Sequence, residues 1–227
     1  MDAYEDNLGK SWDYNYVGPA PRNVNPGPIV DFVLSHVKDS RSLLYIGFGS
    51  GDNAVPLLDS GLDLWATEVS EMAVERAHAV FPHYQDRLTL GGVSDAYPGK
   101  VFAGAVVSRV LMEGSLHAAA ERMSAVATRL SAGGDLFLQV PALGTDIWPD
   151  WEAFEIDSYG NLIMKYNRDI PGKVYYTSAG VIALCHESGL ELEEGPQPRS
   201  LPRTSFPGGY VRYWIAKASV PSRSIRR

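Results

Sequence analysis

Apolar and polar positions alternate with two different periods along the first 140 residues. Apolar positions three to four residues apart predict amphipathic helices, and short continuous apolar runs predict buried strands. The predicted helices cover residues 29–37, 52–61, 70–81 and 115–130. The predicted strands cover residues 42–48, 62–69, 87–90, 104–110 and 135–141. This alternation predicts a mostly parallel sheet with helices on both faces.

The pattern changes after the last of these strands. Residues 143–176 are rich in aromatic and turn-forming residues, and the sequence YGN at residues 159–161 predicts the tip of a hairpin. A helix is predicted over residues 177–189, with Thr177 or Ser178 as its N-cap. The stretches LELEE and YVRYWIAK predict two final strands. The Pro-rich loop between them is too short for a helical crossover, so these strands are expected to be antiparallel.

Composition and charge narrow the classes of protein to which the chain can belong. Of its 227 residues, 45% are hydrophobic and 21% are charged, as in an ordinary soluble globular protein. The formal net charge of −7 argues against a nucleic-acid partner, because phosphate binding depends on dense Lys and Arg. No apolar run reaches the ~18 residues that a membrane span needs, so no membrane partner is expected.

Cysteine usage and the first residues predict a cytoplasmic protein. The single cysteine, Cys185, cannot form an internal disulfide, which is typical of a reducing compartment. The apolar positions before it predict a buried, unreactive thiol. The first ten residues, MDAYEDNLGK, are acidic and polar and lack the apolar core of a signal peptide.

A glycine cluster follows the first predicted strand. The stretch SLLYIGFGSGDNAVPLL carries Gly47, Gly49 and Gly51 directly before the next predicted helix. Such a cluster lets the backbone turn sharply and lets a ligand approach it closely. Three interpretations are open: a tight turn without a ligand, a dinucleotide site of the G-x-G-x-x-A type, and a nucleoside site in which the amino-acid end of S-adenosylmethionine lies over the glycines.

Glu68 supports a nucleoside ligand. It ends the second predicted strand, 21 positions after Gly47 (68 − 47), where a carboxylate can accept hydrogen bonds from both ribose hydroxyls. Either cofactor would use it. The second half of the chain favours the methyl donor, because a dinucleotide fold would continue with further parallel strand–helix units. This chain instead ends with an aromatic segment, a helix and two antiparallel strands.

These motifs together resemble the class I S-adenosylmethionine-dependent methyltransferases. Residues 43–77 resemble the family's glycine loop, its acidic ribose-binding position and the S-x-x-A start of the following helix. The stretch GGVSDAY, residues 91–97, resembles the loop whose Asp-Ala faces the adenine. Residues 102–141 resemble the fourth strand, the next helix and the L-x-P-G-G turn into the fifth strand, and residues 174–194 resemble the late helix and final hairpin.

The resemblance implies a Rossmann-like α/β fold with a seven-stranded, mostly parallel sheet and a C-terminal antiparallel hairpin. The single domain, residues 1–227, would comprise a leader and first helix (1–40), a nucleoside-binding core (41–142), a substrate-cap insertion (143–176), the last helix and strands (177–218) and a tail (219–227). The cofactor would be S-adenosylmethionine, with S-adenosylhomocysteine as product. Its implied binding residues are Gly47, Gly49, Gly51, Glu68, Val69, Asp95, Ala96, Ser108 and Tyr14.

The chain departs from the family pattern at three positions. Tyr45 stands where the family usually has an acid two residues before the first glycine. Ala103 replaces the acid before the fourth strand, and Ala132 replaces the proline of P-G-G. The methionine end of the donor would therefore be held differently, by backbone groups or by residues of the leader.

Candidate residues for the acceptor lie at the end of the fourth predicted strand, or follow the fourth and fifth predicted strands. Glu113 and His117 are candidates for a general base, and Arg109, Trp148 and Tyr166 are candidates for substrate binding. Each has an ordinary alternative. The two candidate bases can be surface or capping residues, and the aromatic residues can form a homodimer interface. In the same way, the aromatic leader can cover the donor or lie on the surface, and Asp95 can be a solvated turn residue.

The sequence therefore predicts a methyltransferase that transfers a methyl group in line to O, N or S of a small organic molecule. One alternative is a protein of the same fold that binds S-adenosylmethionine without transferring methyl, in a cyclase-like or binding role. A weaker alternative is an NAD(P)-dependent oxidoreductase. No metal site is expected.

Overall fold

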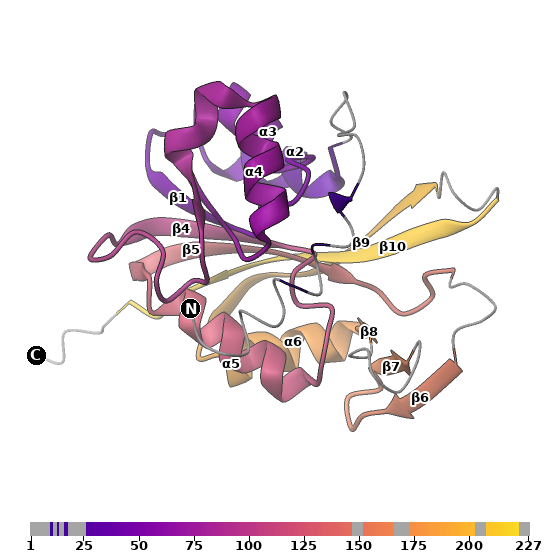
Figure 1. The fold of residues 1–227 in the computed structure, drawn as a ribbon. Coiled ribbons are helices and arrows are strands. Elements are labelled where there is room, and N and C mark those ends of the chain that lie inside the picture. The colour runs from indigo at the N-terminus through magenta and orange to yellow at the C-terminus, as the bar shows by residue number, and fades with distance from the viewer. Residues whose placement is uncertain are drawn as a thin grey trace, which may run out of the picture. The chain divides into compact units, whose positions relative to one another are not determined.

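A computed structural model gives the fold of the chain (Figure 1). It describes residues 10, 13, 16–17, 26–146, 152–165, 173–202 and 208–222. The chain divides into two compact units. Unit 1 comprises Met1–Val106 and Arg129–Gly134, and unit 2 comprises Val107–Thr128 and Asp135–Arg227.

Seven strands form one sheet in the order β3-β2-β1-β4-β5-β10-β9. They are β1 (Ser42–Ile46), β2 (Asp63–Glu68), β3 (Leu88–Leu90), β4 (Phe102–Ser108), β5 (Leu130–Pro141), β9 (Glu191–Pro202) and β10 (Tyr210–Ser219). β1 pairs with β2, and β2 with β3, in parallel. β10 pairs antiparallel with both β5 and β9. The predicted seven-stranded α/β fold with an antiparallel C-terminal hairpin is confirmed.

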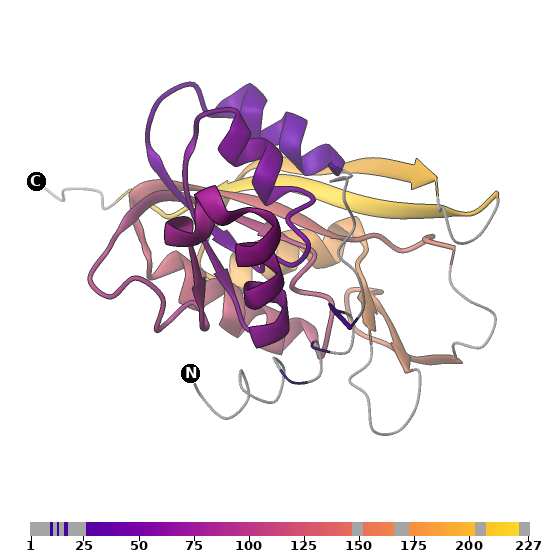
Figure 2. The same cartoon turned by 45° about the horizontal axis from the view of Figure 1, so that its top comes forward.

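The helices of unit 1 lie on one side of β1 (Figures 1 and 2). They are α2 (Pro28–His36), α3 (Ala54–Asp59) and α4 (Glu71–Val80), and the 3₁₀ helix η2 (Pro82–Arg87) leads into β3. α4 starts where the sequence predicts it, because the Ser70 hydroxyl accepts a hydrogen bond from the Ala73 N–H as an N-cap. Leu43 and Leu44 of β1 are fully buried, so this strand forms the centre of the unit's core.

Unit 2 holds two adjacent helices, α5 (Leu116–Ala127) and α6 (Ser178–Glu187), which lie side by side (Figure 1). Their first turns are capped by the side chains of Ser115 and Thr177, as expected from residues with a short side-chain oxygen. α6 packs against β9 and β10 of the same unit. Cys185 of α6 is buried, as predicted, and burial raises the pKa of its thiol to about 11.

A second, three-stranded sheet is built from the aromatic-rich part of the chain. Its order is β6-β7-β8, with bounds Glu152–Ile156, Leu162–Lys165 and Lys173–Tyr175, and neighbouring strands are antiparallel. The β6–β7 turn contains residues 159–161, as predicted, and Gly160 adopts a left-handed φ of 75° there. The buried Asn161 accepts the Thr177 N–H at Oδ1 over 2.8 Å, which ties the hairpin to the start of α6.

The two largest errors in the predicted boundaries concern β5 and β9. The sequence predicts a turn over residues 131–134, but β5 already begins at Leu130. The Phe102 N–H donates to the Arg129 carbonyl, so the chain enters the ladder of β4 immediately after α5. The first half of the predicted Pro-rich loop also belongs to a strand, because β9 continues to Pro202. β9 lies at the edge of the sheet, where a residue without an N–H is tolerated.

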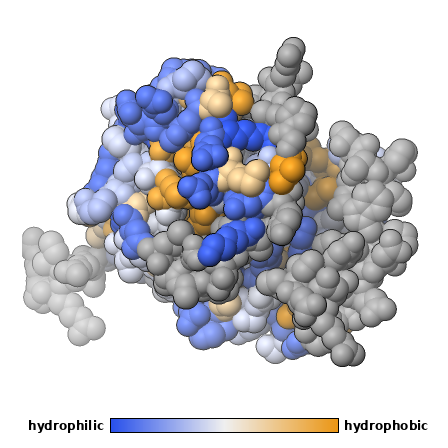
Figure 3. Space-filling view, viewed as in Figure 1, coloured by the Kyte–Doolittle hydropathy of each residue, from blue (hydrophilic) through white to orange (hydrophobic). Residues whose placement is uncertain are grey.

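The surface of the described residues mixes both kinds of side chain. Hydrophilic residues predominate on the face seen in Figure 3, and apolar residues lie between them. Such a mixture is ordinary for surface in contact with water. Within the described ranges, no helix combines the length and apolar character needed to cross a membrane.

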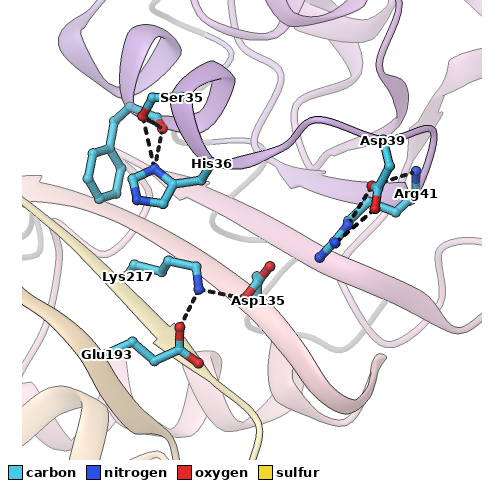
Figure 4. Close-up of polar contacts among 8 residues, drawn as sticks. Ser35, His36, Asp39, Arg41, Asp135, Glu193 and Lys217 are labelled. Carbon is cyan, nitrogen blue, oxygen red and sulfur yellow. Dashed lines mark hydrogen bonds and ion pairs between the residues drawn. The ribbon is translucent and has the colours of Figure 1, made fainter.

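Two groups of ion pairs, which differ in burial, are visible in Figure 4. In unit 2, the Lys217 ammonium contacts Asp135 at 2.8 Å and Glu193, which joins β10 to both of its neighbouring strands. Its side chain is only 13% exposed. Burial lowers the pKa of Lys217, but the two carboxylates raise it more, so the net shift is upward. In unit 1, Arg41 pairs with Asp39 on the surface.

We expect Lys217→Met to lower the free energy of unfolding by about 1–2 kcal/mol, because it leaves Asp135 without its cation in a mostly buried position. Arg41→Gln is the control and should cause no measurable change, since exposed pairs are screened by water. Because the folded pKa of Lys217 is raised, its stabilisation is complete below about pH 10 and is lost as the pH rises through that pKa. Urea unfolding between about pH 6 and 9 should give a constant difference. Equal effects of both substitutions would contradict this account.

Candidate functional site

The parallel strands β1, β2 and β3 of unit 1 end at the same edge of the sheet. The glycine loop follows β1, and its Gly47 and Phe48 N–H groups both donate to the Thr67 carbonyl, at 2.9 and 3.0 Å. Gly47, Gly49 and Gly51 have left-handed φ values of 74°, 56° and 82°. Only glycine adopts such angles readily, so the cluster is required by the turn itself. Ligands of open parallel sheets bind at this edge.

The glycines differ in what lies beside them. A Cβ at Gly51 would lie 2.9 Å from Val55 Cγ2 and 3.1 Å from ring atoms of Phe48 and Phe81. Gly51 is therefore also required by packing inside unit 1. A Cβ at Gly49 would instead lie 3.0 Å from the Tyr16 hydroxyl oxygen. A residue of the leader thus lies directly against the middle of the glycine loop.

Glu68, at the end of β2, joins the glycine loop to the turn before α4. Its Oε2 accepts the Gly49 N–H at 2.8 Å, and its Oε1 accepts the N–H groups of Val69 and Ser70 at 2.8 and 2.9 Å. These bonds use three of the roughly four acceptor positions of a carboxylate. The side chain is only 6% exposed. Burial raises the pKa of Glu68 above its ordinary value, and the three N–H groups act against that rise.

Residues of the leader form hydrogen bonds with α4 and with its N-cap. The Asp13 Oδ1 accepts a hydrogen bond from the Ser70 hydroxyl at 2.5 Å, and its negative charge contributes to the raised pKa of Glu68. The Arg76 guanidinium donates to the Tyr16 carbonyl at 3.2 Å. These contacts place Asp13 and Tyr16 at the same edge of the sheet as Glu68.

The loop after β3 is the third part of this edge. Its first residue, Gly91, donates its N–H to the Glu68 carbonyl at 2.8 Å. Further along, the Asp95 side chain is exposed and Ala96 is buried. Unit 1 therefore brings together the glycine loop, Glu68, Val69 and the Asp95–Ala96 pair at the carboxyl ends of three consecutive strands.

Ser108 and Arg109 belong to unit 2, at the end of β4. The Ser108 hydroxyl donates to Gln139 Oε1 at 3.1 Å, and both side chains are buried. Arg109 is exposed and has a φ of 61°, which is uncommon for a residue other than glycine. Its N–H donates to the Gln139 carbonyl at 2.9 Å, which keeps the strained residue within the ladder. Such strain is often found at functional positions.

Glu113 lies in the segment that follows. It forms an isolated antiparallel bridge with Lys173 of β8, and its carbonyl accepts a hydrogen bond from Arg122. Burial raises the pKa of Glu113, whereas the positive charges of Lys173 and Arg122 lower it. A carboxyl with a raised pKa is better suited to exchange protons near neutral pH than an ordinary one.

The surroundings of His117 differ from those of Glu113. α5 begins at Leu116, so Glu113 precedes the helix and the two residues do not share a helical face. The His117 side chain is 80% exposed, and its Nε2 lies 3.5 Å from Glu121. This arrangement is that of a surface i,i+4 pair.

Comparisons with known proteins were made by sequence and by structure. No protein-family model matches the sequence, and no curated protein matches it. Solved structures do match. An S-adenosylmethionine-dependent methyltransferase from Methanosarcina mazei is 13% identical, with a TM-score of 0.66 over 88% of this chain and 100% of that one. The Burkholderia thailandensis 1,6-didemethyltoxoflavin-N1-methyltransferase, solved with 1,6-didemethyltoxoflavin and S-adenosylhomocysteine, is 15% identical, with a TM-score of 0.64 over 96% and 88%. The [4+2]-cyclase SpnF is 14% identical, with a TM-score of 0.64 over 96% of both chains.

The chain has the class I methyltransferase fold. The resemblance seen in the sequence is confirmed at this level, because the strand order and the nearly full-length likenesses agree. The edge formed by β1, β2 and β3 carries the residues that the sequence singled out for a nucleoside, except Ser108, which lies at the end of β4, and Tyr14, which lies outside the described residues. The same fold occurs in a protein named as a cyclase.

The predicted site residues fall into three groups. Gly47, Gly49, Gly51, Glu68, Val69, Asp95 and Ala96 lie in unit 1, and Ser108, Arg109, Glu113 and His117 lie in unit 2. Tyr14, Trp148 and Tyr166 lie outside the described residues. The sequence analysis did not single out Asp13, Tyr16 as a loop contact, or Arg129. An acidic leader was visible in the sequence, but nothing in the pattern indicates which of its side chains reach the glycine loop.

We expect Glu68→Ala to lower the free energy of unfolding by about 1–3 kcal/mol, because three N–H groups at the sheet edge lose their shared acceptor. Glu75→Ala, at an exposed position of α4, is the charge-matched control and should stay within about 0.5 kcal/mol of the wild type. Chemical denaturation followed by circular dichroism measures both. A Glu68→Ala protein as stable as the control would show that Glu68 does not join the two turns.

Proposed function

We propose that this chain is an S-adenosylmethionine-dependent methyltransferase that acts on a small organic molecule. The observation that carries the proposal is the convergence, within a class I methyltransferase fold, of the glycine loop, Glu68 and the Asp95–Ala96 pair at one sheet edge. A glycine loop admits a ligand close to the backbone, a carboxylate accepts ribose hydroxyls, and the third loop supplies groups for the base.

The nucleoside would bind through these three loops. The ribose hydroxyls would donate to Oε2 of Glu68, where they would compete with the Gly49 N–H that the same oxygen now accepts. Val69 would pack against the adenine, and the Asp95 carboxylate would accept a hydrogen bond from its 6-amino group. The B. thailandensis enzyme was solved with S-adenosylhomocysteine bound, which supports the choice of nucleoside.

The methionine end would lie between the glycine loop and the leader. Tyr45, which occupies the family's acidic position, is only 2% exposed, so its side chain belongs to the core. Besides Glu68, the Tyr16 side chain reaches the loop, and its hydroxyl faces Gly49. Backbone groups of the loop and this hydroxyl would therefore replace the usual carboxylate.

When bound, S-adenosylmethionine supplies an electrophilic methyl group on its sulfonium sulfur. Transfer to O, N or S is an in-line displacement, so the protein contributes mainly by holding donor and acceptor in contact. Glu113 would take the acceptor's proton where the acceptor carries one, since burial raises the pKa of its carboxyl. Arg109, Trp148 and Tyr166 are proposed to bind the acceptor, and His117 is a second proposed base. The B. thailandensis neighbour holds 1,6-didemethyltoxoflavin, which supports an organic acceptor of small size.

A second candidate is a protein that binds S-adenosylmethionine without transferring methyl. SpnF, a [4+2]-cyclase of the same fold, and the loss of two family acids at Tyr45 and Ala103 favour it. The two candidates differ in turnover. A methyltransferase forms S-adenosylhomocysteine when it is offered a panel of aromatic alcohols, amines and thiols with S-adenosylmethionine, whereas a binding protein does not.

The remaining proposals concern location and partners. The acidic net charge supports a small-molecule substrate rather than nucleic acid, and the single buried cysteine supports a cytoplasmic location. A homodimer interface is the alternative use of the aromatic residues at 143–176.

We expect S-adenosylhomocysteine to bind with low-micromolar affinity or better, about 8 kcal/mol, in isothermal titration calorimetry, whereas NAD(P)H should give no heat. Gly49→Ala should weaken binding more than tenfold, about 1.4 kcal/mol, because the added methyl group would meet the ligand. That methyl group would also meet Tyr16, so the same substitution is made in a Tyr16→Phe background, where the contacting hydroxyl is absent. The tenfold loss should persist there.

Gly61→Ala is the matched control for backbone strain. Gly61 has a φ of 88° and no atom within 4 Å of an added Cβ, so this change affects stability without affecting affinity. No binding of S-adenosylhomocysteine at millimolar concentration would contradict the proposed function. A Gly49→Ala effect that disappears in the Tyr16→Phe background would show that the loop contacts only the tyrosine.

A further inference from the structure

One arginine side chain donates hydrogen bonds to several carbonyl groups of the loop after β3. The Arg129 guanidinium donates to the carbonyls of Val93, Ala96 at 2.6 Å, Tyr97 at 2.9 Å and Lys100 at 3.4 Å. All of these residues belong to unit 1, although Arg129 is about 30 positions away in sequence. The loop therefore wraps around a single planar cation.

The backbone conformation of this loop explains why its carbonyl groups need a side-chain donor. Tyr97 has a φ of 49°, and Gly91 and Gly99 at its two ends have φ values of 140° and 74°. These angles fold the loop back on itself, and two of its N–H groups bond carbonyls of the same loop, from Ala96 to Gly92 and from Lys100 to Tyr97. Side-chain N–H groups thus bond loop carbonyls that backbone N–H groups would bond in a helix or strand.

The loop is also fixed to the sheet below it. The Tyr97 hydroxyl donates to the carbonyls of Ala66 at 2.7 Å and Arg87 at 3.0 Å. The Gly91 N–H donates to the Glu68 carbonyl. Gly91 therefore anchors the first end of the loop independently of Arg129, and Tyr97 provides a second anchor directly after Ala96. Asp95 lies between the Val93 and Ala96 carbonyls, both of which bond Arg129.

We propose that Arg129 is a positioning residue for base recognition, which holds the Asp95–Ala96 pair so that the chain distinguishes a 6-amino from a 6-oxo purine. The inference rests on the proposed function, since it requires that this pair faces the base. Arg129 itself does not touch the ligand. It acts through the Val93 and Ala96 carbonyls, which lie on either side of Asp95 in the sequence.

The chemistry of the side chain makes the proposal specific to arginine. A guanidinium presents five N–H donors in a rigid plane, which suits several carbonyls around one point. Lysine presents three donors on a flexible stem, and glutamine presents two without charge. Arg129→Lys should therefore hold the loop partly, and Arg129→Gln should not hold it.

The test compares two ligands in isothermal titration calorimetry. S-Adenosylhomocysteine carries a 6-amino group that can donate to the Asp95 carboxylate, whereas S-inosylhomocysteine carries a 6-oxo group that cannot. The wild type should prefer the adenine ligand about tenfold or more. In Arg129→Gln the preference should fall below about threefold, and Arg129→Lys should give an intermediate ratio, as expected when a charged hydrogen bond is weakened. Arg41→Gln, which removes an exposed guanidinium that pairs with Asp39, should keep the wild-type ratio.

The ratio of the two affinities distinguishes a role of Arg129 in positioning the Asp95–Ala96 pair from a role in overall stability. A merely structural role for Arg129 would lower both affinities equally or lower the melting temperature with the ratio unchanged, and either result would overturn the proposal. If Arg129→Gln does not fold, the ratio measured for Arg129→Lys decides. A wild type that binds both ligands equally would also overturn it while leaving the proposed function intact. A wild type that binds neither ligand would contradict the proposed function itself.

Discussion

One buried carboxylate connects the turns on which the candidate site depends. Glu68 accepts hydrogen bonds from Gly49, in the loop after β1, and from Val69 and Ser70, in the turn before α4. Neither turn has a regular ladder to satisfy these N–H groups, and a buried N–H without a partner costs about 1–3 kcal/mol. The carbonyl of the same residue accepts the Gly91 N–H, so the loop after β3 is tied to this point as well.

The same junction determines the electrostatic surroundings of the Glu68 carboxylate. Burial and the nearby Asp13 disfavour the charge on Glu68, and the N–H groups favour it. Ribose hydroxyls are further donors to an oxygen in this position, so a nucleoside would relieve part of the cost of burying the charge. Residues of the leader also lie at this junction. Asp13 accepts a hydrogen bond from the Ser70 hydroxyl that caps α4, and Tyr16 faces the glycine loop.

Most of the fold could be predicted from the sequence, because local patterns determine where most helices and strands begin. Contacts between residues far apart in the sequence could not be predicted. The helix starts at α4 and α6 follow from Ser70 and Thr177, because an N-cap acts on its own first turn. The extent of β9 was missed because its prolines indicate a loop, and only its position at the sheet edge makes them acceptable. The loop after β3 was located by its Asp-Ala pair, but the role of Arg129 within it depends on contacts across about 30 residues, which no local pattern encodes. Likewise, the leader's aromatic residues were visible, whereas the contact of Tyr16 with Gly49 was not.

The central claim is that a nucleoside binds across the ends of β1, β2 and β3. A crystal structure of the full chain with S-adenosylhomocysteine tests it most directly. The account predicts the ribose hydroxyls within hydrogen-bond distance of Glu68, the adenine beside Val69 and the Asp95–Ala96 pair, and the homocysteine end between Gly49 and Tyr16. A complex in which the ligand lies elsewhere, and Glu68 makes no ribose contact, would contradict it.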